Sequence, residues 1–555
     1  MDLPLSFDEY SDGDYVDVCS GLPSGPPSPL VTLPVELLVN IWQITMVATD
    51  GQGTYAQKTS SKTAWHILKR FMSVCRYWRD AALLAPILWR DVECNGIVWR
   101  RVAKMLQRSG QTPLHLTATC KADGTACITR GDVDELITRE FHRVEKLCVI
   151  VPHAGVSDGQ YDMPILRVLK VDYRTRQYND DPVPLVATSS PLPLLEELDF
   201  AGMAFTRVRP YFRPTLRRLQ LASSPPRLCA ATADLIYALQ HTPFLEELCI
   251  RHLFDLTSTR DQSPLPLVQL PHLKVLRLED EPVSCGRILD HLVFPSSIFP
   301  CQNFTASSSW ASPYSGASIE NNGRLLAAVF SKLAGRGVIG DVQAADSLSI
   351  TYRGFCNKFS MNLEVWDSSS QRIFTDWFEG WKEVTLSALL DCISAADTYG
   401  FFAAVRTLHV SVDNDYHLSV SPSTQILTTF GQVQTLHIKS EFQETNFETR
   451  GAKSRNYGSQ PHLSLATVLI PQLHTLILTS VDFRVCYSRS LIGVYGEEST
   501  IEFISRLRDA VRARKEQGAP LKHLEIRDGW RFVKEDAEIL RKYVERVVWD
   551  CSCEI

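Results

Sequence analysis

One short apolar pattern recurs along most of the chain and constrains its fold more than any other feature. It consists of a leucine-type residue, two variable residues, a leucine, one variable residue and a further apolar residue. The first two copies read Leu166-Arg-Val-Leu169-Lys-Val171 and Leu195-Glu-Glu-Leu198-Asp-Phe200, and later copies begin at positions 216, 245, 273, 405, 433, 473 and 521. A period of roughly 20–30 residues with such an internal pattern is typical of a repeat solenoid.

The pattern resembles that of leucine-rich repeats, in which parallel strands line the inside and helices the outside of a solenoid. We therefore expect an α/β fold with an irregular solenoid over residues 93–555. Its early strands should lie at 114–116 and 144–149, and a helix at 234–239. Another helix, with Phe503, Leu507 and Val511 on one face, should end at Gly518. Such a solenoid holds a partner, which favours a binding protein.

The bulk composition excludes several classes of partner. The chain has 555 residues, 45% of them hydrophobic, and a net charge of -6, so no global field favours nucleic acid or an anionic membrane. We find no export signal and no apolar run of the ~18 residues that a membrane span needs. The 15 cysteines are scattered, which favours reduced core thiols and a cytoplasmic or nuclear location.

Three segments interrupt the regular pattern. Residues 1–29 contain six acidic residues and no basic residue, and then become rich in Pro and Gly, so we expect a disordered, self-repelling tail. Residues 295–322 are rich in Ser, Asn, Ala and Pro, and residues 440–462 are polar and patternless. Both are predicted to be irregular loops.

Residues 30–92 differ from the repeats and predict a helical module. Pro34 suits the first position of a helix, and Glu36 favours its positive end. Apolar residues then cover most of that helix: Val35, Leu37, Leu38, Ile41, Trp42 and Ile44. A second helix carries two apolar stripes. The first comprises Trp65, Leu68, Met72 and Cys75, and the second comprises Ile67, Phe71, Val74 and Trp78. Helices that are apolar nearly all round bury two faces, so the second face packs either on the solenoid or on a helix of another chain.

Two motifs in this module carry a resemblance to a known family. Leu33-Pro34-Val-Glu36-Leu37-Leu38-x-x-Ile41-Trp42, followed by Val74-Cys75-Arg76-x-Trp78-Arg79, resembles an F-box. The continuation Ala85-Pro86-Ile-Leu88-Trp89 is similar to the segment after the motif in many fungal F-box proteins. The connection at 49–63 is longer than in the common F-box, and its Gly, Gln, Ser and Thr content predicts a flexible loop.

The resemblance implies a non-catalytic substrate-recognition subunit of an SCF-type cullin–RING ubiquitin ligase. The F-box would bind the Skp-type adaptor, and the repeats would capture an unknown protein target. The residues expected at the adaptor are Leu33, Pro34, Glu36, Leu37, Ile41, Val74, Cys75 and Trp78. The alternative is an interaction scaffold outside any ligase, whose F-box-like helices cap the solenoid.

Charged and histidine positions on the predicted strands are candidates for target contact. The charged positions alternate in sign from repeat to repeat: Glu197, Asp199, Arg218, Glu247 and Arg277. They form either a cross-strand ladder or a surface that recognises a protein segment. His409 and His437 occupy the same slot of successive copies, so their rings should lie ~4.8 Å apart on the exposed inner face. This arrangement would fit either two solvated histidines or a pair that senses pH or binds a metal ion.

The sequence motifs do not indicate an enzyme activity or a cofactor. Gly335-Arg-Gly337-Val-Ile-Gly340 matches a dinucleotide pattern, but a helical run precedes it and a strand-like run follows, the reverse of what pyrophosphate binding needs. Cys120, Cys127 and His115 lie close in sequence at a spacing that fits no standard zinc site. We therefore predict no enzyme activity, no cofactor and no metal centre.

Overall fold

The computed structural model describes most of the regular elements of the chain. The described residues are 33–50, 62–94, 99–119, 139–151, 162–173, 192–222, 231–254, 264–280, 282–298, 304–307, 325, 327–329, 331–332, 338–339, 346–355, 358–366, 372–381, 405–413, 431–441, 470, 472–481, 483, 503–529 and 532–550. The predicted tail at 1–29, the glycines of the 335–340 motif, Cys120 and Cys127 lie outside them. The chain forms two compact units, residues 1–171 with 179–194, and residues 172–178 with 195–555.

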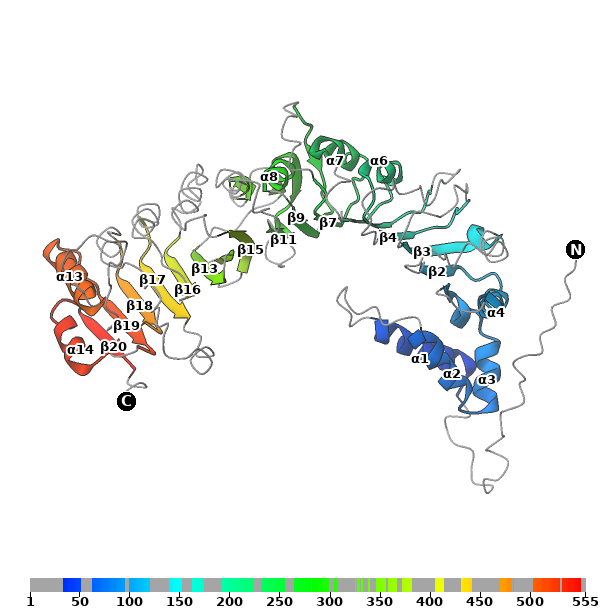
Figure 1. Cartoon of the computed structure of the whole chain (residues 1–555), viewed down its shortest axis with the longest axis horizontal. Helices are drawn as coiled ribbons and strands as arrows, with labels where there is room; N and C mark the ends of the chain where they lie inside the picture. Colours follow the sequence, from blue (N-terminus) through cyan, green and yellow to red (C-terminus); the bar gives the residue numbers. More distant parts are fainter. Residues whose placement is uncertain are drawn as a thin grey trace, which may run out of the picture. The chain divides into compact units, whose positions relative to one another are not determined.

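The first unit begins with helices (Figure 1). They are α1 (Val35–Asp50), α2 (Lys62–Met72), α3 (Arg76–Leu83) and the 3-10 helix η4 (Pro86–Trp89). The predicted second helix is therefore divided in two, with Val74 and Cys75 between the parts, because Cys75 caps the start of α3. The Pro34 carbonyl accepts hydrogen bonds from the amides of Leu37 and Leu38, both at 3.1 Å, so α1 begins one residue after the predicted proline position. The expected 49–63 connection is shorter at both ends, because residues 49–50 and 62–63 are helical, and 51–61 lie outside the described residues.

The strands of the first unit come after these helices in the sequence. They are β1 (Asp91–Glu93), β2 (Leu114–Thr119), β3 (Val144–Val151) and β4 (Val168–Tyr173), in that order, with β1–β2 and β2–β3 parallel. The two early strands predicted from the sequence are thus confirmed. Helix α4 (Trp99–Ser109) packs against η4 and β1, so the predicted boundary near residue 92 falls inside this compact unit.

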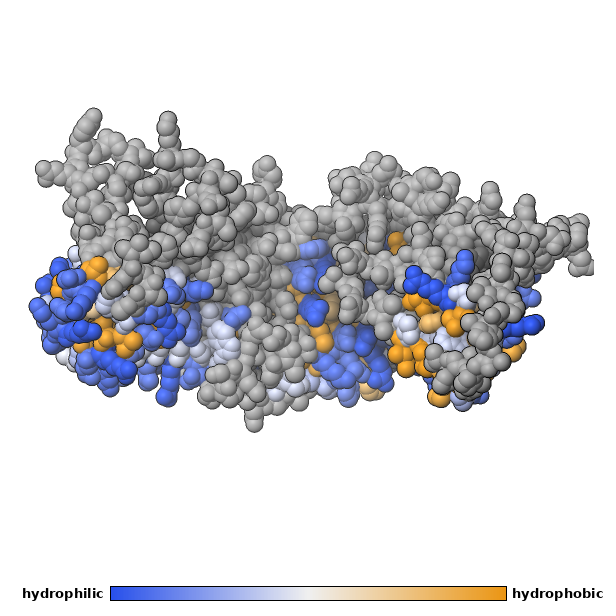
Figure 2. Space-filling view, turned by 90° about the horizontal axis from the view of Figure 1, so that it is seen from below, coloured by the Kyte–Doolittle hydropathy of each residue, from blue (hydrophilic) through white to orange (hydrophobic). Residues whose placement is uncertain are grey.

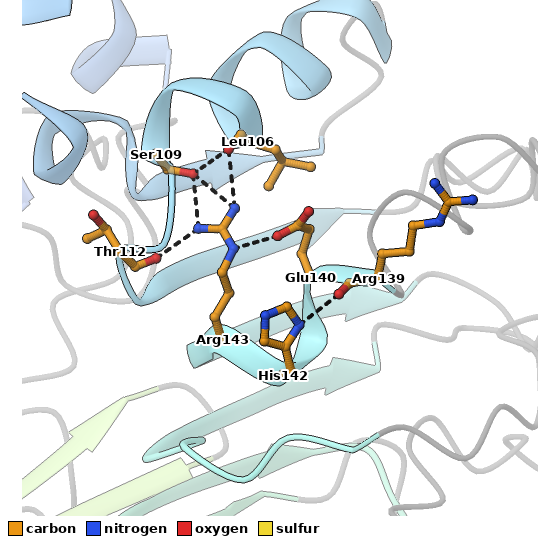
Figure 3. A network of polar contacts seen from close by, with 7 residues as sticks. All are labelled: Leu106, Ser109, Thr112, Arg139, Glu140, His142 and Arg143. Carbon is orange, nitrogen blue, oxygen red and sulfur yellow. Dashed lines mark hydrogen bonds and ion pairs between the residues drawn. The ribbon is translucent and has the colours of Figure 1, made fainter. Parts of the chain in front are cut away.

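A buried arginine joins the end of α4 to the start of β3 (Figure 3). Arg143 is only 4% exposed and donates to the Leu106 carbonyl at 3.2 Å and the Thr112 carbonyl at 2.8 Å. It also donates to the Ser109 hydroxyl at 3.1 Å, and its Nε lies 2.5 Å from a Glu140 oxygen. The guanidinium therefore supplies donors to carbonyls at and just after the C-terminal end of α4, where few main-chain amides are available to them.

The first sheet of the second unit is built from the recurring apolar pattern. Its parallel strands are β5 (Glu197–Ala201), β6 (Arg218–Ala222), β7 (Glu247–Arg251), β9 (Val275–Glu279) and β11 (Phe304–Ser307). The central leucines of the pattern align across the strands and are at most 1% exposed: Leu198, Leu219, Leu248 and Leu276. Outer helices follow the strands, namely α6 (Phe205–Val208), η6 (Arg209–Tyr211), α7 (Thr232–Leu239) and α8 (Pro282–His291). Figure 1 shows α7 and α8 on the same side of β7 and β9.

The interval predicted to be irregular at 295–322 contains regular structure. It holds the 3-10 helix η8 (Ser296–Ile298) and β11, which pairs with β9 so that Thr305 lies opposite Arg277. The Ser- and Asn-rich composition did not indicate this strand, because main-chain hydrogen bonds to a neighbouring strand require no particular side chain. A small sheet of β8 (Val268–Gln269), β10 (Leu292–Pro295) and β12 (Val338–Ile339) lies nearby in sequence.

A third sheet in this unit has eight strands among the described residues and is mixed. Parallel strands β16 (Thr407–Asp413), β17 (Thr435–Glu441), β18 (Thr475–Thr479), β19 (His523–Arg527) and β20 (Arg546–Trp549) follow β13 (Ser347–Phe355). However, β13, β14 (Lys358–Trp366) and β15 (Arg372–Trp381) are antiparallel, which corrects the expectation of parallel strands throughout. The reason is connection length, because a parallel pair needs a crossover of roughly a dozen residues and only residues 356–357 separate β13 from β14.

Helices α13 (Phe503–Glu516) and α14 (Lys534–Leu540) accompany the last strands. Gly518 has a φ of +79°, and the amide of Ala519 donates to the Arg514 carbonyl at 3.0 Å. This left-handed turn ends α13 where the sequence predicted it, because glycine adopts positive φ without the steric cost that other residues incur. Of the predicted loop at 440–462, residues 440–441 belong to β17 and the remainder lies outside the described residues.

Candidate protein-docking surfaces

An aromatic cluster fixes the inner face of the N-terminal helices. Trp42 is fully buried, stacks on Phe71 at a centroid distance of 5.3 Å and meets the Trp78 ring edge-on at 5.5 Å. Leu38, one turn before Trp42, is also fully buried. Aromatic pairs of this kind contribute about 0.5–1.5 kcal/mol each beyond the area they bury. The cluster therefore sets which side of α1 faces its neighbours.

Three of the predicted adaptor residues are engaged inside this module. The Tyr77 hydroxyl donates to the Leu33 carbonyl at 2.7 Å, and Leu33 is half-buried. Cys75 caps the start of α3, where its sulfur accepts the amide of Trp78 at 3.5 Å. Trp78 itself belongs to the aromatic cluster. The main chain of Leu33 and the side chains of Cys75 and Trp78 therefore make contacts within the module.

An apolar row lies on the opposite side of α1. Leu37, Ile41 and Ile44 are 50%, 47% and 69% exposed, and their spacing of four and three residues places them along one helix face. Val74, between α2 and α3, is 54% exposed. Figure 2 shows apolar residues exposed over these N-terminal helices. We call Leu37, Ile41 and Ile44 the apolar row. Contiguous exposed apolar side chains of this kind mark interaction surfaces.

Sequence reasoning identified most, but not all, of this exposed surface. Leu37, Ile41 and Val74 were predicted and are exposed, as are Pro34 and Glu36 at the start of α1. Ile44 was placed on the helix but not in the site, although it lies three residues beyond Ile41 on the same face. Leu84, which is 81% exposed after α3, was missed, because an isolated leucine carries no periodic signal.

The charged positions of the first repeat strands form cross-strand neighbours. Arg218 lies opposite Glu197 on one side and Glu247 on the other, and its Nε is 3.2 Å from a Glu247 oxygen. Asp199 lies opposite Gln220, and Arg277 lies opposite Cys249. The predicted set is therefore brought onto neighbouring strands, with a direct ion pair between Arg218 and Glu247.

Glu246, which sequence reasoning did not single out, forms a second charged contact. It receives hydrogen bonds from Lys274 at 2.5 Å and from Arg217 at 2.7 Å. These two donors, Lys274 first, lower the pKa of the Glu246 carboxyl. The sequence could have indicated this contact, since Arg217, Glu246 and Lys274 each directly precede a strand in successive repeats.

His115 lies in an acidic setting on the strands of the first unit. Its Nδ1 is 2.7 Å from an Asp91 oxygen, and its Nε2 is 3.7 Å from Glu145. Burial raises the pKa of Asp91, but the hydrogen bond and charge of His115, with Arg90 and Lys146, outweigh it and the pKa is lowered. The contacts of His115 are thus made with carboxylates across the sheet.

His409 and His437 meet across β16 and β17, as their shared slot predicted. They are direct partners in the parallel register, their Nδ1 atoms are 3.1 Å apart, and their ring centroids are 5.2 Å apart. The Nε2 of His437 lies 2.8 Å from the Thr479 hydroxyl, and Trp366 meets His409 edge-on at 6.3 Å. The rings are half-buried, which corrects the expectation of an exposed pair.

Burial shifts the protonation of both histidines. Burial lowers the pKa of His409. The pKa of His437 is lowered to about 4, chiefly by burial and next by the neighbouring His409. Arg527 and Lys439 lower the pKa of His437 further, while Glu525 raises it. Both rings are therefore neutral at neutral pH.

Comparisons with protein-family models, with curated proteins and with solved structures found no match to this chain. Among the described residues, no group of three or more His, Cys, Asp or Glu side chains is arranged to hold a metal ion. Within the same part of the chain, every helix is too short or too polar to cross a lipid bilayer.

Proposed function

We propose that this chain is the substrate-recognition subunit of an SCF-type cullin–RING ubiquitin ligase. In this proposal, residues 30–92 act as an F-box that docks the Skp-type adaptor. The repeats act as an irregular leucine-rich-repeat solenoid that captures a protein target in the cytoplasm or nucleus. The chain itself carries out no chemistry, and other subunits transfer ubiquitin to the target.

The apolar row on α1 is the observation that carries this proposal. Leu38 and Trp42 already anchor α1 to its own module, so Leu37 and Ile41 on the other face contribute little to that core. Exposed apolar side chains are costly in water, and a complementary apolar surface of a partner would remove them from it. The F-box-like motif that contains these residues identifies the expected partner as the Skp-type adaptor.

The repeat strands support the second half of the proposal. Parallel strands that present charges of both signs, as Arg218 and Glu247 do, form a surface suited to a protein segment of mixed charge. Solenoids use such extended inner surfaces for binding.

A calorimetric titration with purified Skp-type adaptor tests the proposal. The variant Leu37→Asp/Ile41→Asp should bind at least 100-fold more weakly, since each lost apolar anchor is worth about 2 kcal/mol. The variant Leu267→Asp is the matched control, because Leu267 is 65% exposed but lies beside β8 in the second unit. Circular dichroism confirms that all variants are folded. Unchanged affinity in the double variant would exclude the apolar row as the adaptor site.

A second function, a scaffold outside any ligase, is favoured by one specific observation. The N-terminal helices share a compact unit with β1 to β3, and α4 packs against both η4 and β1, as a cap of a repeat array would. That function predicts no adaptor binding at all by the wild-type chain. Proteins that co-purify with the chain when proteasomal degradation is blocked would then show partners of constant abundance, whereas ligase targets would accumulate.

A further inference from the structure

We propose that His409 and His437 form a binding site for a divalent zinc-class ion, with the remaining coordination positions filled by water. This inference is independent of the ubiquitin-ligase proposal. It begins from the sequence, because the two histidines occupy the same slot of successive repeats and the parallel register sets them side by side.

The separation of the two ring nitrogens suits a shared metal ion. A zinc ion binds imidazole nitrogen at about 2.0 Å, so two such ligands lie about 2.8 Å apart at a right angle and about 3.3 Å apart at the tetrahedral angle. The Nδ1 atoms of His409 and His437 are 3.1 Å apart, between these limits. For both rings to bind one ion, each would rotate so that its Nδ1 lone pair points at a shared position instead of at the other ring.

Thr479 supplies the outer contact that a ligating histidine needs. Its hydroxyl lies 2.8 Å from Nε2 of His437, the ring nitrogen that faces away from His409. When Nε2 donates its proton to this hydroxyl, Nδ1 is left with a free lone pair directed at His409. Outer hydrogen bonds of this kind fix the tautomer and orientation of metal-binding histidines.

The charged groups that face His437 are Arg527, Lys439 and Glu525, and the two cations oppose a divalent ion. Glu525 partly offsets them while it accepts a hydrogen bond from Arg527 at 2.8 Å. Among the described residues no third His, Cys, Asp or Glu side chain completes a metal-binding group with this pair, so we expect modest affinity.

Calorimetric titration of the full chain with ZnCl2 tests the site. His409→Ala and His437→Ala should each weaken zinc binding at the proposed site at least tenfold. His142→Ala, which removes an exposed histidine in the first unit, should leave it unchanged. Substitution with Co2+ separates ligand types, because thiolate ligation gives a strong near-ultraviolet absorption that imidazole ligation lacks. Unchanged zinc affinity in both pair variants, or the absence of a wild-type site, would overturn the proposal. If the pair variants lower only the melting temperature and leave zinc binding intact, the pair is a structural hydrogen bond alone.

Discussion

The Nε of Arg218 lies 3.2 Å from Oε1 of Glu247, directly opposite it on the next parallel strand. Both side chains are solvent-exposed, at 58% and 37%, so water screens their attraction. Glu197 lies opposite the same arginine on its other side. One cation between two carboxylates makes this position informative, because structural pairing and target recognition predict different effects of substitution.

Charge reversal at Glu197 and Glu247 distinguishes the two roles. If these residues contact a target, the Glu197→Lys/Glu247→Lys variant should capture it more weakly than the wild type and leave adaptor binding intact. This loss of capture should be smaller at high salt, because screening reduces the charge effect. Loss of the exposed pairs alone should cost at most about 1 kcal/mol of stability. Melting temperature and target retention are measured on one sample. Full retention at both salt concentrations would rule out this patch as the recognition surface.

Arg514 should be far more important to stability than its exposed neighbour Arg512. Arg514 is 1% exposed, and its two terminal nitrogens donate to the Ile470 and Leu473 carbonyls, both at 2.8 Å. Arg514→Met keeps most of the apolar stem but leaves both carbonyls without these donors, at a cost of about 3 kcal/mol. Arg512→Met on the same helix removes only exposed ion pairs and should cost less than about 0.5 kcal/mol. Urea denaturation measures both; equal midpoints would contradict the structural role.

The histidine pair should make stability fall in mild acid. Burial lowers the pKa of both rings from 6.5, that of His437 to about 4, so the unfolded chain binds more protons than the folded chain in this range. The stability that the neutral pair contributes is therefore present above pH 6.5 and is lost as the pH falls from about 6.5 to about 4. The effect should be of order 1 kcal/mol, given partial solvent screening.

Unfolding free energies of wild type and His437→Asn over this range check the pH effect. The variant should show a shallower slope, and His142→Asn should follow the wild type. These measurements are made without added metal and in the presence of a chelator. An identical slope in His437→Asn would show that other groups cause the acid sensitivity.

The sequence by itself determined the strands of the repeats and their buried faces. In each copy the leucine-type positions are separated by variable, mostly polar residues, and that spacing predicts which side of a strand enters the core. Leu198, Leu219, Leu248 and Leu276 are accordingly buried in register. The shared slot of His409 and His437 likewise predicted their contact, because parallel strands in register bring equivalent positions together.

The tertiary structure alone decided features that depend on neighbours distant in sequence. The antiparallel β13–β15 region and strand β11 arise from main-chain pairing, which side-chain composition does not reveal. Leu37 is exposed while the adjacent Leu38 is buried, although both are leucines, because only Leu38 faces the side that Trp42 anchors against Phe71. A helix that is apolar on nearly all sides does not encode which side meets its own core. Packing of α1 against α2 and α3 makes that choice and leaves the apolar row available to a partner.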